Sequence, residues 1–140
     1  MFIREDFITV SEWGKMSMCD AKRRILANAL LDISNEQFIL VSESCIPLFN
    51  FSFVHGYIMR SKHSFIVAFD DHGPYGRGWY NENMAPEVNI LPASVKGLNG
   101  LRLTGSSPVS MVEDTTYYPK FEEFCRPHCY VDEHYFPLPS

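Results

Sequence analysis

The sequence predicts one α/β domain whose strands form a mostly parallel sheet. The 140 residues match the size of one domain. Their content of 46% apolar and 14% aromatic residues is typical of a globular protein rather than a disordered one. The strand-like run Phe38-Ile39-Leu40-Val41 is apolar at every position, as in strands that are covered on both faces of a parallel sheet.

The N-terminal third predicts a weak strand, a helix and the apolar strand just described. The weak strand lies within Met1 to Trp13. The helix has Ser17 as its N-cap and runs to about Ile33. Its expected apolar face consists of Cys19, Leu26, Ala29, Leu30 and Ile33. Its basic residues are expected on the solvated face, and they are Lys22, Arg23 and Arg24.

A second helix is predicted from Phe53 to Met59 with Ser52 as its cap, followed by a strand from Ser64 to Phe69. Residues 91–110 show neither a helical nor a strand period and are rich in Gly, Ser, Pro and Leu. They predict a loop that is long for a compact domain.

Polar residues follow the apolar strand at its carboxyl end. Open α/β sheets bind ligands at this edge, so Glu43, Ser44 and Cys45 are candidates for substrate contact. The alternative is a polar strand end that Pro47 closes. Asn50-Phe51-Ser52 forms a sequon for N-glycosylation, which has meaning only in a secreted or luminal chain.

Two further motifs follow the strand that ends at Phe69. Asp70-Asp71-His72 could supply oxygen ligands to a divalent metal, although adjacent aspartates on an extended chain point in opposite directions. The loop of residues 73–78 lacks the Lys-Ser/Thr ending of a phosphate-binding loop. Its Tyr75 and Arg77 are candidates for holding a sugar, by ring stacking and fork hydrogen bonds.

Residues 114–137 combine acidic and aromatic side chains with two cysteines and two histidines. Burying Asp132 and Glu133 without partners would be costly, so their aromatic flanks suggest a cleft. A carboxylate in such a cleft can have a raised pKa and act as a general base. The alternative is a solvated turn.

Charge and cysteine spacing limit the remaining function classes. The net charge of -5 argues against nucleic-acid binding. No apolar run in the sequence has the length of a membrane span, and the first residues do not resemble a signal peptide. Cys125 and Cys129 are close enough for a disulfide in an oxidising compartment. Alternatively, a zinc-stabilised module without enzymatic activity would use Cys125, His128, Cys129 and His134 as ligands.

Several long motifs occur in order along the chain. They are W-G-K-M-S-M at Trp13, L-A-N-A-L-L-D-I-S-N-E at Leu26, F-I-L-V-S-E-S-C-I-P-L-F-N-F at Phe38, D-D-H-G-P-Y-G-R-G at Asp70, N-E-N-M-A-P-E-V at Asn81, D-T-T-Y-Y-P-K-F at Asp114 and F-C-R-P-H-C-Y-V-D-E-H-Y-F-P at Phe124. Read together, these motifs resemble the plant branch of the core-2/I-branching beta-1,6-N-acetylglucosaminyltransferase family, which is glycosyltransferase family fourteen.

The resemblance implies a GT-A-like fold in a type II membrane glycoprotein on the luminal side of the Golgi membrane. It implies inverting transfer of a sugar, typically N-acetylglucosamine, from a UDP-sugar donor to a hydroxyl of a glycan acceptor. The family's catalytic base corresponds to Glu133. The family is similar to GT-A enzymes that use basic side chains rather than a metal cofactor, which argues against a metal at Asp70 and Asp71.

The sequence departs from the family pattern in two respects. Family members are more than twice this length, so we expect a central fragment of a catalytic domain, inactive by itself, that lacks the membrane anchor and the basic residues that hold UDP. The resemblance also stops after Ile90 and resumes at Met111. One back-translation of residues 97–108, read in another frame, gives the family-like S-Q-W-F-E-V-D-R-E-L-A, so we predict that residues 91–110 are a frame-shifted loop.

Overall fold

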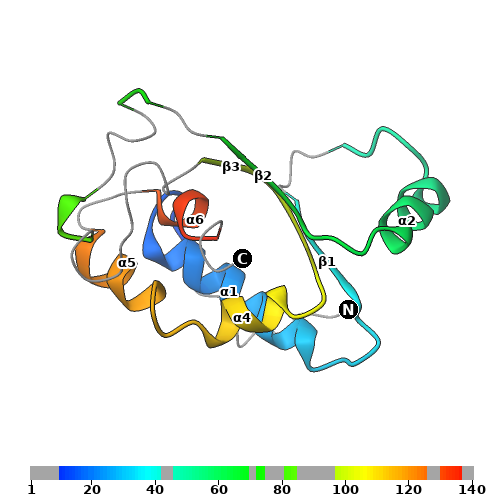
Figure 1. Cartoon of the computed structure of the whole chain (residues 1–140), viewed down its shortest axis with the longest axis horizontal. Coiled ribbons are helices and arrows are strands. Elements are labelled where there is room, and N and C mark those ends of the chain that lie inside the picture. The colour runs from blue at the N-terminus through cyan, green and yellow to red at the C-terminus, as the bar shows by residue number, and fades with distance from the viewer. Residues whose placement is uncertain are drawn as a thin grey trace.

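The computed structural model describes residues 10–41, 46–69, 72–74, 81–84, 97–125 and 130–136. Within these ranges a three-stranded sheet packs against a group of helices, and the core lies between them. Figure 1 shows α1 (Met16–Leu30), α4 (Ser107–Glu113), α5 (Tyr118–Phe124) and α6 (Val131–His134) on one side of the strands. Helix α2 (Phe51–Arg60) lies apart from this group.

Helix α1 forms where the helical period predicts it, with corrected ends. Its N-cap is Lys15, whereas the hydroxyl of Ser17 accepts a hydrogen bond of 3.0 Å from the amide of Glu12. The helix ends at Leu30, and Ile33, predicted on its apolar face, is 98% exposed. Cys19 and Leu26 are buried as predicted because they face the other helices and the sheet.

The sheet is antiparallel in both of its described pairings, which corrects the predicted parallel arrangement. Strand β3 (Gly97–Thr104) lies between β1 (Gln37–Leu40) and β2 (Phe65–Phe69) and is antiparallel to each. The apolar run of β1 gave the wrong expectation because β1 is not covered on both faces. Ile39 is 48% and Leu40 37% exposed.

Strand β3 also corrects the prediction of a loop at residues 91–110. Leu101 and Leu103 alternate with Arg102 and are 6% and 2% exposed, so their side chains enter the core. This alternation is too short to stand out between glycines and serines. Helix α4 follows at once, with Pro108 in its first turn, a position where a missing amide hydrogen has little consequence. The structure does not test whether a frame shift produced the segment.

Arg102 ties α2 to the sheet. Its guanidinium donates hydrogen bonds to the carbonyl oxygens of Ile58, Ser61 and His63, at 2.7, 2.9 and 2.9 Å, and to the side chain of Gln37 at 2.7 Å. These carbonyls lie at and just after the C-terminal end of α2, where a cation also interacts favourably with the helix dipole.

The N-terminal end of α2 is capped by Asn50 instead of the predicted Ser52. The side-chain oxygen of Asn50 accepts a hydrogen bond of 2.9 Å from the amide of Phe53. This geometry satisfies one of the amides that a helix leaves without an internal partner.

The core joins α1, β3 and the C-terminal helices through mostly apolar and aromatic side chains. Its fully buried members include Met84, Met111, Phe121, Val131, Tyr135 and Phe136. Met84 belongs to η3 (Glu82–Met84), which a hydrogen bond of 2.9 Å from Asn81 to the carbonyl of Phe124 holds against α5. Among the described residues, no helix has the length and apolar character needed to cross a bilayer.

Candidate functional site

Glu133 lies on α6, a single turn of helix whose other side is buried. Val131, His134 and Tyr135 are 1%, 2% and 0% exposed, whereas the side chain of Glu133 is only partly buried. The amide of Glu133 donates a hydrogen bond of 2.9 Å to the carbonyl of Tyr130, which closes the turn. The buried neighbours of Glu133 therefore fix the position of the backbone that carries its carboxylate.

The aromatic residues beside the acidic pair do not form the expected cleft. Tyr135 and Phe136 are buried in the core, at 0% and 1% exposure. Tyr130 instead packs beside the first described residues of the chain. Its ring makes an edge contact with Trp13, with 5.2 Å between the ring centroids.

Tyr130 and Gly14 determine how the chain enters α6. Tyr130 has a φ of 47°, in the left-handed region that is uncommon for a residue with a side chain. Gly14 has a φ of 76°, and a Cβ atom placed on it would lie 3.1 Å from the Tyr130 ring. The absence of a side chain at Gly14 thus makes room for the ring that precedes α6.

Tyr135 anchors the C-terminal end of α6 to α4. Its hydroxyl donates a hydrogen bond of 3.2 Å to the carbonyl of Met111, and both residues are fully buried. Burial raises the pKa of the Tyr135 hydroxyl above its ordinary value. The hydroxyl is therefore a neutral donor that holds α6, not a proton-transfer group at neutral pH.

Arg23 was predicted on the solvated face of its helix, but its side chain packs against α4 and α5. Its guanidinium lies 3.7 Å from the centroid of the Tyr118 ring and donates a hydrogen bond of 2.7 Å to the carbonyl of Val112. The nearby hydroxyl of Tyr118 donates to Asp20. The sequence does not reveal this arrangement, because three basic residues on a helix give the same pattern whether or not one of them packs against other elements.

Asp114 follows the last residue of α4 and precedes α5, and the sequence did not indicate a role for it. Its carboxylate accepts hydrogen bonds from the amides of Thr116, Tyr117 and Tyr118, at 2.9, 3.1 and 2.8 Å. Burial raises the pKa of Asp114, but these hydrogen bonds outweigh burial and hold the pKa below its ordinary value. The signal was present in D-T-T-Y-Y-P, an acidic residue followed closely by a helix with proline in its first turn.

The zinc-site hypothesis is wrong in at least one of its ligands. Cys125 is bonded in a disulfide, so its sulfur is not available as a thiolate ligand. The partner of Cys125 lies outside the described residues, and its pairing with Cys129 stays a prediction. His128 and Cys129 also lie outside the described residues, whereas His134 is buried in the core. The described residues contain no cluster of metal-ligating side chains.

The predicted substrate contacts all fall outside the described ranges. This applies to Glu43, Ser44, Cys45, Tyr75 and Arg77, and also to Asp70 and Asp71. The structure therefore neither brings them toward Glu133 nor separates them from it.

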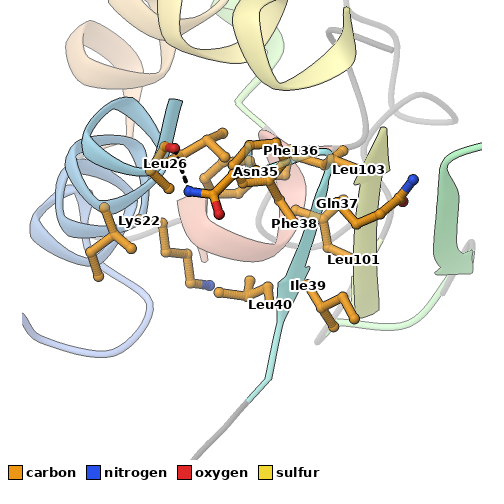
Figure 2. A pocket seen from close by; sticks show the side chains of 12 residues that line it. Lys22, Leu26, Asn35, Gln37, Phe38, Ile39, Leu40, Leu101, Leu103 and Phe136 are labelled. Carbon is orange, nitrogen blue, oxygen red and sulfur yellow. Dashed lines mark hydrogen bonds between the residues drawn. The ribbon is translucent and has the colours of Figure 1, made fainter. Parts of the chain in front are cut away.

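A pocket of about 260 Å³ lies between α1 and the sheet. Figure 2 shows Leu26, Phe38, Leu101, Leu103 and Phe136 around it, together with the polar side chains of Lys22, Asn35 and Gln37. Asn35 donates a hydrogen bond of 2.8 Å to the carbonyl of Ala29. Glu133 is not among the residues that line this pocket. The pocket is chiefly apolar, and it is separate from the region around Glu133.

Comparisons with known proteins confirm the resemblance. Residues 5–138 match the family model described as Core-2/I-Branching enzyme. The chain is 41% identical over 117 residues to glycosyltransferase BC10 of Oryza sativa subsp. japonica. This alignment covers 82% of the chain and 28% of the relative, so the chain spans less than a third of that protein's length. No solved structure matches the chain.

Proposed function

The chain belongs to the Core-2/I-branching enzyme family, and from this membership we propose that its residues form part of the catalytic domain of a glycosyltransferase. The observation that carries the proposal is the family match over residues 5–138. The proposed reaction is the inverting transfer of a sugar, of the acetylglucosaminyltransferase type, from a UDP-sugar to a hydroxyl of a glycan. The GT-A-like fold of the complete domain is part of the same proposal.

In this reaction Glu133 is the general base. Its carboxylate accepts the proton of the acceptor hydroxyl while that oxygen bonds to the anomeric carbon, and the bond from this carbon to UDP breaks. The support is local: the backbone of α6 is fixed by Tyr130 and Tyr135, while the side chain of Glu133 keeps access to solvent. A base must be held at a defined position to act efficiently.

The proposal also places the protein in an oxidising compartment. The disulfide of Cys125 supports the Golgi lumen, because disulfides persist in the secretory pathway and are rare in the cytosol. Membrane attachment through an N-terminal anchor outside these residues is part of the same proposal. The acceptor-binding roles of Glu43, Ser44, Cys45, Tyr75 and Arg77 and a metal-independent mechanism remain parts of the proposal.

The test is a transfer assay with a full-length family protein that carries these residues. The donors are UDP-N-acetylglucosamine, UDP-xylose and UDP-glucuronic acid, each with a set of glycan acceptors. We expect one donor to be used, with inverted configuration in the product by NMR and unchanged activity in EDTA. The 140-residue chain alone is expected to show no turnover. Retention of configuration would overturn the proposed mechanism, and no transfer from any donor would overturn the proposed function.

A further inference from the structure

Asn50 lies in an unusual place, at the exposed N-terminal end of α2. Arg102 binds the carbonyls at the other end of this helix, and no residue of α2 is fully buried. Figure 1 shows α2 apart from the other α-helices. The start of α2 is thus presented to solvent, while its C-terminal end is fixed to β3.

Exposed aromatic residues lie next to Asn50 in the sequence. Phe49, Phe51 and Phe53 are 60%, 80% and 55% exposed. The rings of Phe49 and Phe53 pack together, with 4.7 Å between their centroids. We call these three residues the aromatic collar. The Phe51 ring packs beside His55, with 5.5 Å between their centroids. Exposed rings gathered at one end of a helix form an apolar surface that another group can cover.

The sequence around Asn50 indicates which kind of group covers the aromatic collar. Asn50-Phe51-Ser52 is the acceptor sequon for N-glycosylation, and it occurs once in the chain. Asn50 is exposed. Its capping hydrogen bond uses the side-chain oxygen, so the side-chain nitrogen, to which a glycan is attached, is not needed for the cap. A glycan and the helix cap can therefore coexist on one side chain.

We propose that Asn50 carries an N-linked glycan whose first sugars cover the aromatic collar. In the transfer step the side-chain nitrogen of Asn50 loses a proton and bonds to the first sugar carbon of a lipid-diphosphate-linked oligosaccharide. The bond from that carbon to the diphosphate breaks, and the lipid diphosphate leaves. The apolar C–H faces of the attached sugars then pack on the rings of Phe49, Phe51 and Phe53 and remove them from water.

The inference rests on the luminal location in the proposed function, so the experiment supplies that location independently. The 140-residue chain is secreted from eukaryotic cells behind a cleavable signal sequence and treated with peptide N-glycosidase. The variants are Ser52→Ala, Ser52→Thr and Asn50→Asp. Ser52→Ala destroys the sequon but keeps the cap, and Ser52→Thr keeps both. Asn50→Asp keeps a capping oxygen but has no nitrogen to modify.

We expect the natural chain and Ser52→Thr to lose the mass of one glycan on treatment. Ser52→Ala and Asn50→Asp should have no glycan to lose. An unglycosylated natural chain, or a glycan that persists in Asn50→Asp, would overturn the assignment. Either result would leave the glycosyltransferase proposal intact, because the signal sequence and not the protein's own targeting provides the compartment.

A second measurement tests whether the glycan covers the collar. The glycosidase converts Asn50 to Asp, which keeps a capping oxygen for α2. We expect the fluorescence of an apolar dye to rise after treatment, because removal of the sugars exposes the collar while the helix cap is unchanged. Replacing Phe49, Phe51 and Phe53 by Ser should abolish the rise. Equal dye binding before and after treatment would contradict the covering role. So would a glycosylated chain that forms dimers by light scattering and becomes monomeric when the three rings are replaced, because a second copy would then be the cover.

Discussion

Strand β3 and helix α6 are each held by one buried polar side chain, but the two side chains work differently. Arg102 in β3 is 7% exposed and makes four hydrogen bonds to groups from β1, from α2 and from the segment after it. Tyr135, next to α6, is fully buried among aromatic rings, and its hydroxyl interacts with a carbonyl of α4 and with the carboxylate of Asp114. β3 therefore depends on a charge surrounded by oxygen acceptors. The position of α6 depends mainly on packing, with the neutral hydroxyl of Tyr135 to orient it.

The largest expected effect follows from reversing the charge in β3. Arg102→Glu would place a carboxylate among the carbonyl oxygens of Ile58, Ser61 and His63, which offer it no donor. We expect the free energy of unfolding to fall by about 3–5 kcal/mol, the range for an uncompensated buried charge. Urea unfolding measures it. Arg102→Lys keeps the charge with fewer donors and should lose less. A loss below ~1 kcal/mol in Arg102→Glu would show that β3 does not depend on this cluster.

A smaller effect is expected from removing the Tyr135 hydroxyl, which helps to orient α6. Tyr135→Phe keeps the ring but leaves the buried carbonyl of Met111 without this donor. The expected loss of unfolding free energy is about 1–2 kcal/mol. Tyr57→Phe is the matched control, because Tyr57 is 63% exposed. Equal stability of both variants would mean that aromatic packing alone positions α6.

The smallest effect concerns the start of α5, and it depends on pH. Asp114→Ala removes the carboxylate that accepts hydrogen bonds from the amides of Thr116, Tyr117 and Tyr118, and it should cost about 1 kcal/mol at pH 7. The hydrogen bonds lower the pKa of Asp114 in the folded state. Its contribution is therefore complete above the unfolded pKa of about 4 and is lost as pH falls through the folded pKa. The stability difference between the natural chain and Asp114→Ala should shrink in chemical unfolding between pH 7 and pH 3. A difference that stays constant would contradict this role.

Family motifs and periodicity predicted the existence of α1, α2, β1 and β2, because each has a clear pattern over several residues. They did not predict which strand lies between β1 and β2. That arrangement depends on Leu101 and Leu103 in a segment whose composition suggests a loop. The family-like reading F-E-V of this segment has the same apolar–charged–apolar order as Leu101-Arg102-Leu103. Either reading can therefore form a strand with one face in the core.

The candidate site was predicted only in part for a similar reason. The motif around Glu133 identified the residue, but sequence spacing could not show that Tyr135 and Phe136 point into the core. Arg23 and Asp114 were missed because their partners lie far away in the chain or in backbone amides. Such contacts depend on tertiary packing, which residue type alone does not reveal.

The measurement that tests the central claim most directly is the turnover of Glu133→Gln in a full-length family protein that carries these residues. If Glu133 is the general base, kcat should fall by about two to four orders of magnitude while donor binding barely changes. Glu123→Gln is the matched control, because Glu123 lies exposed on α5 and its variant should keep natural activity. Activity of Glu133→Gln within about threefold of the natural protein would contradict the assignment, since loss of a general base has a far larger effect.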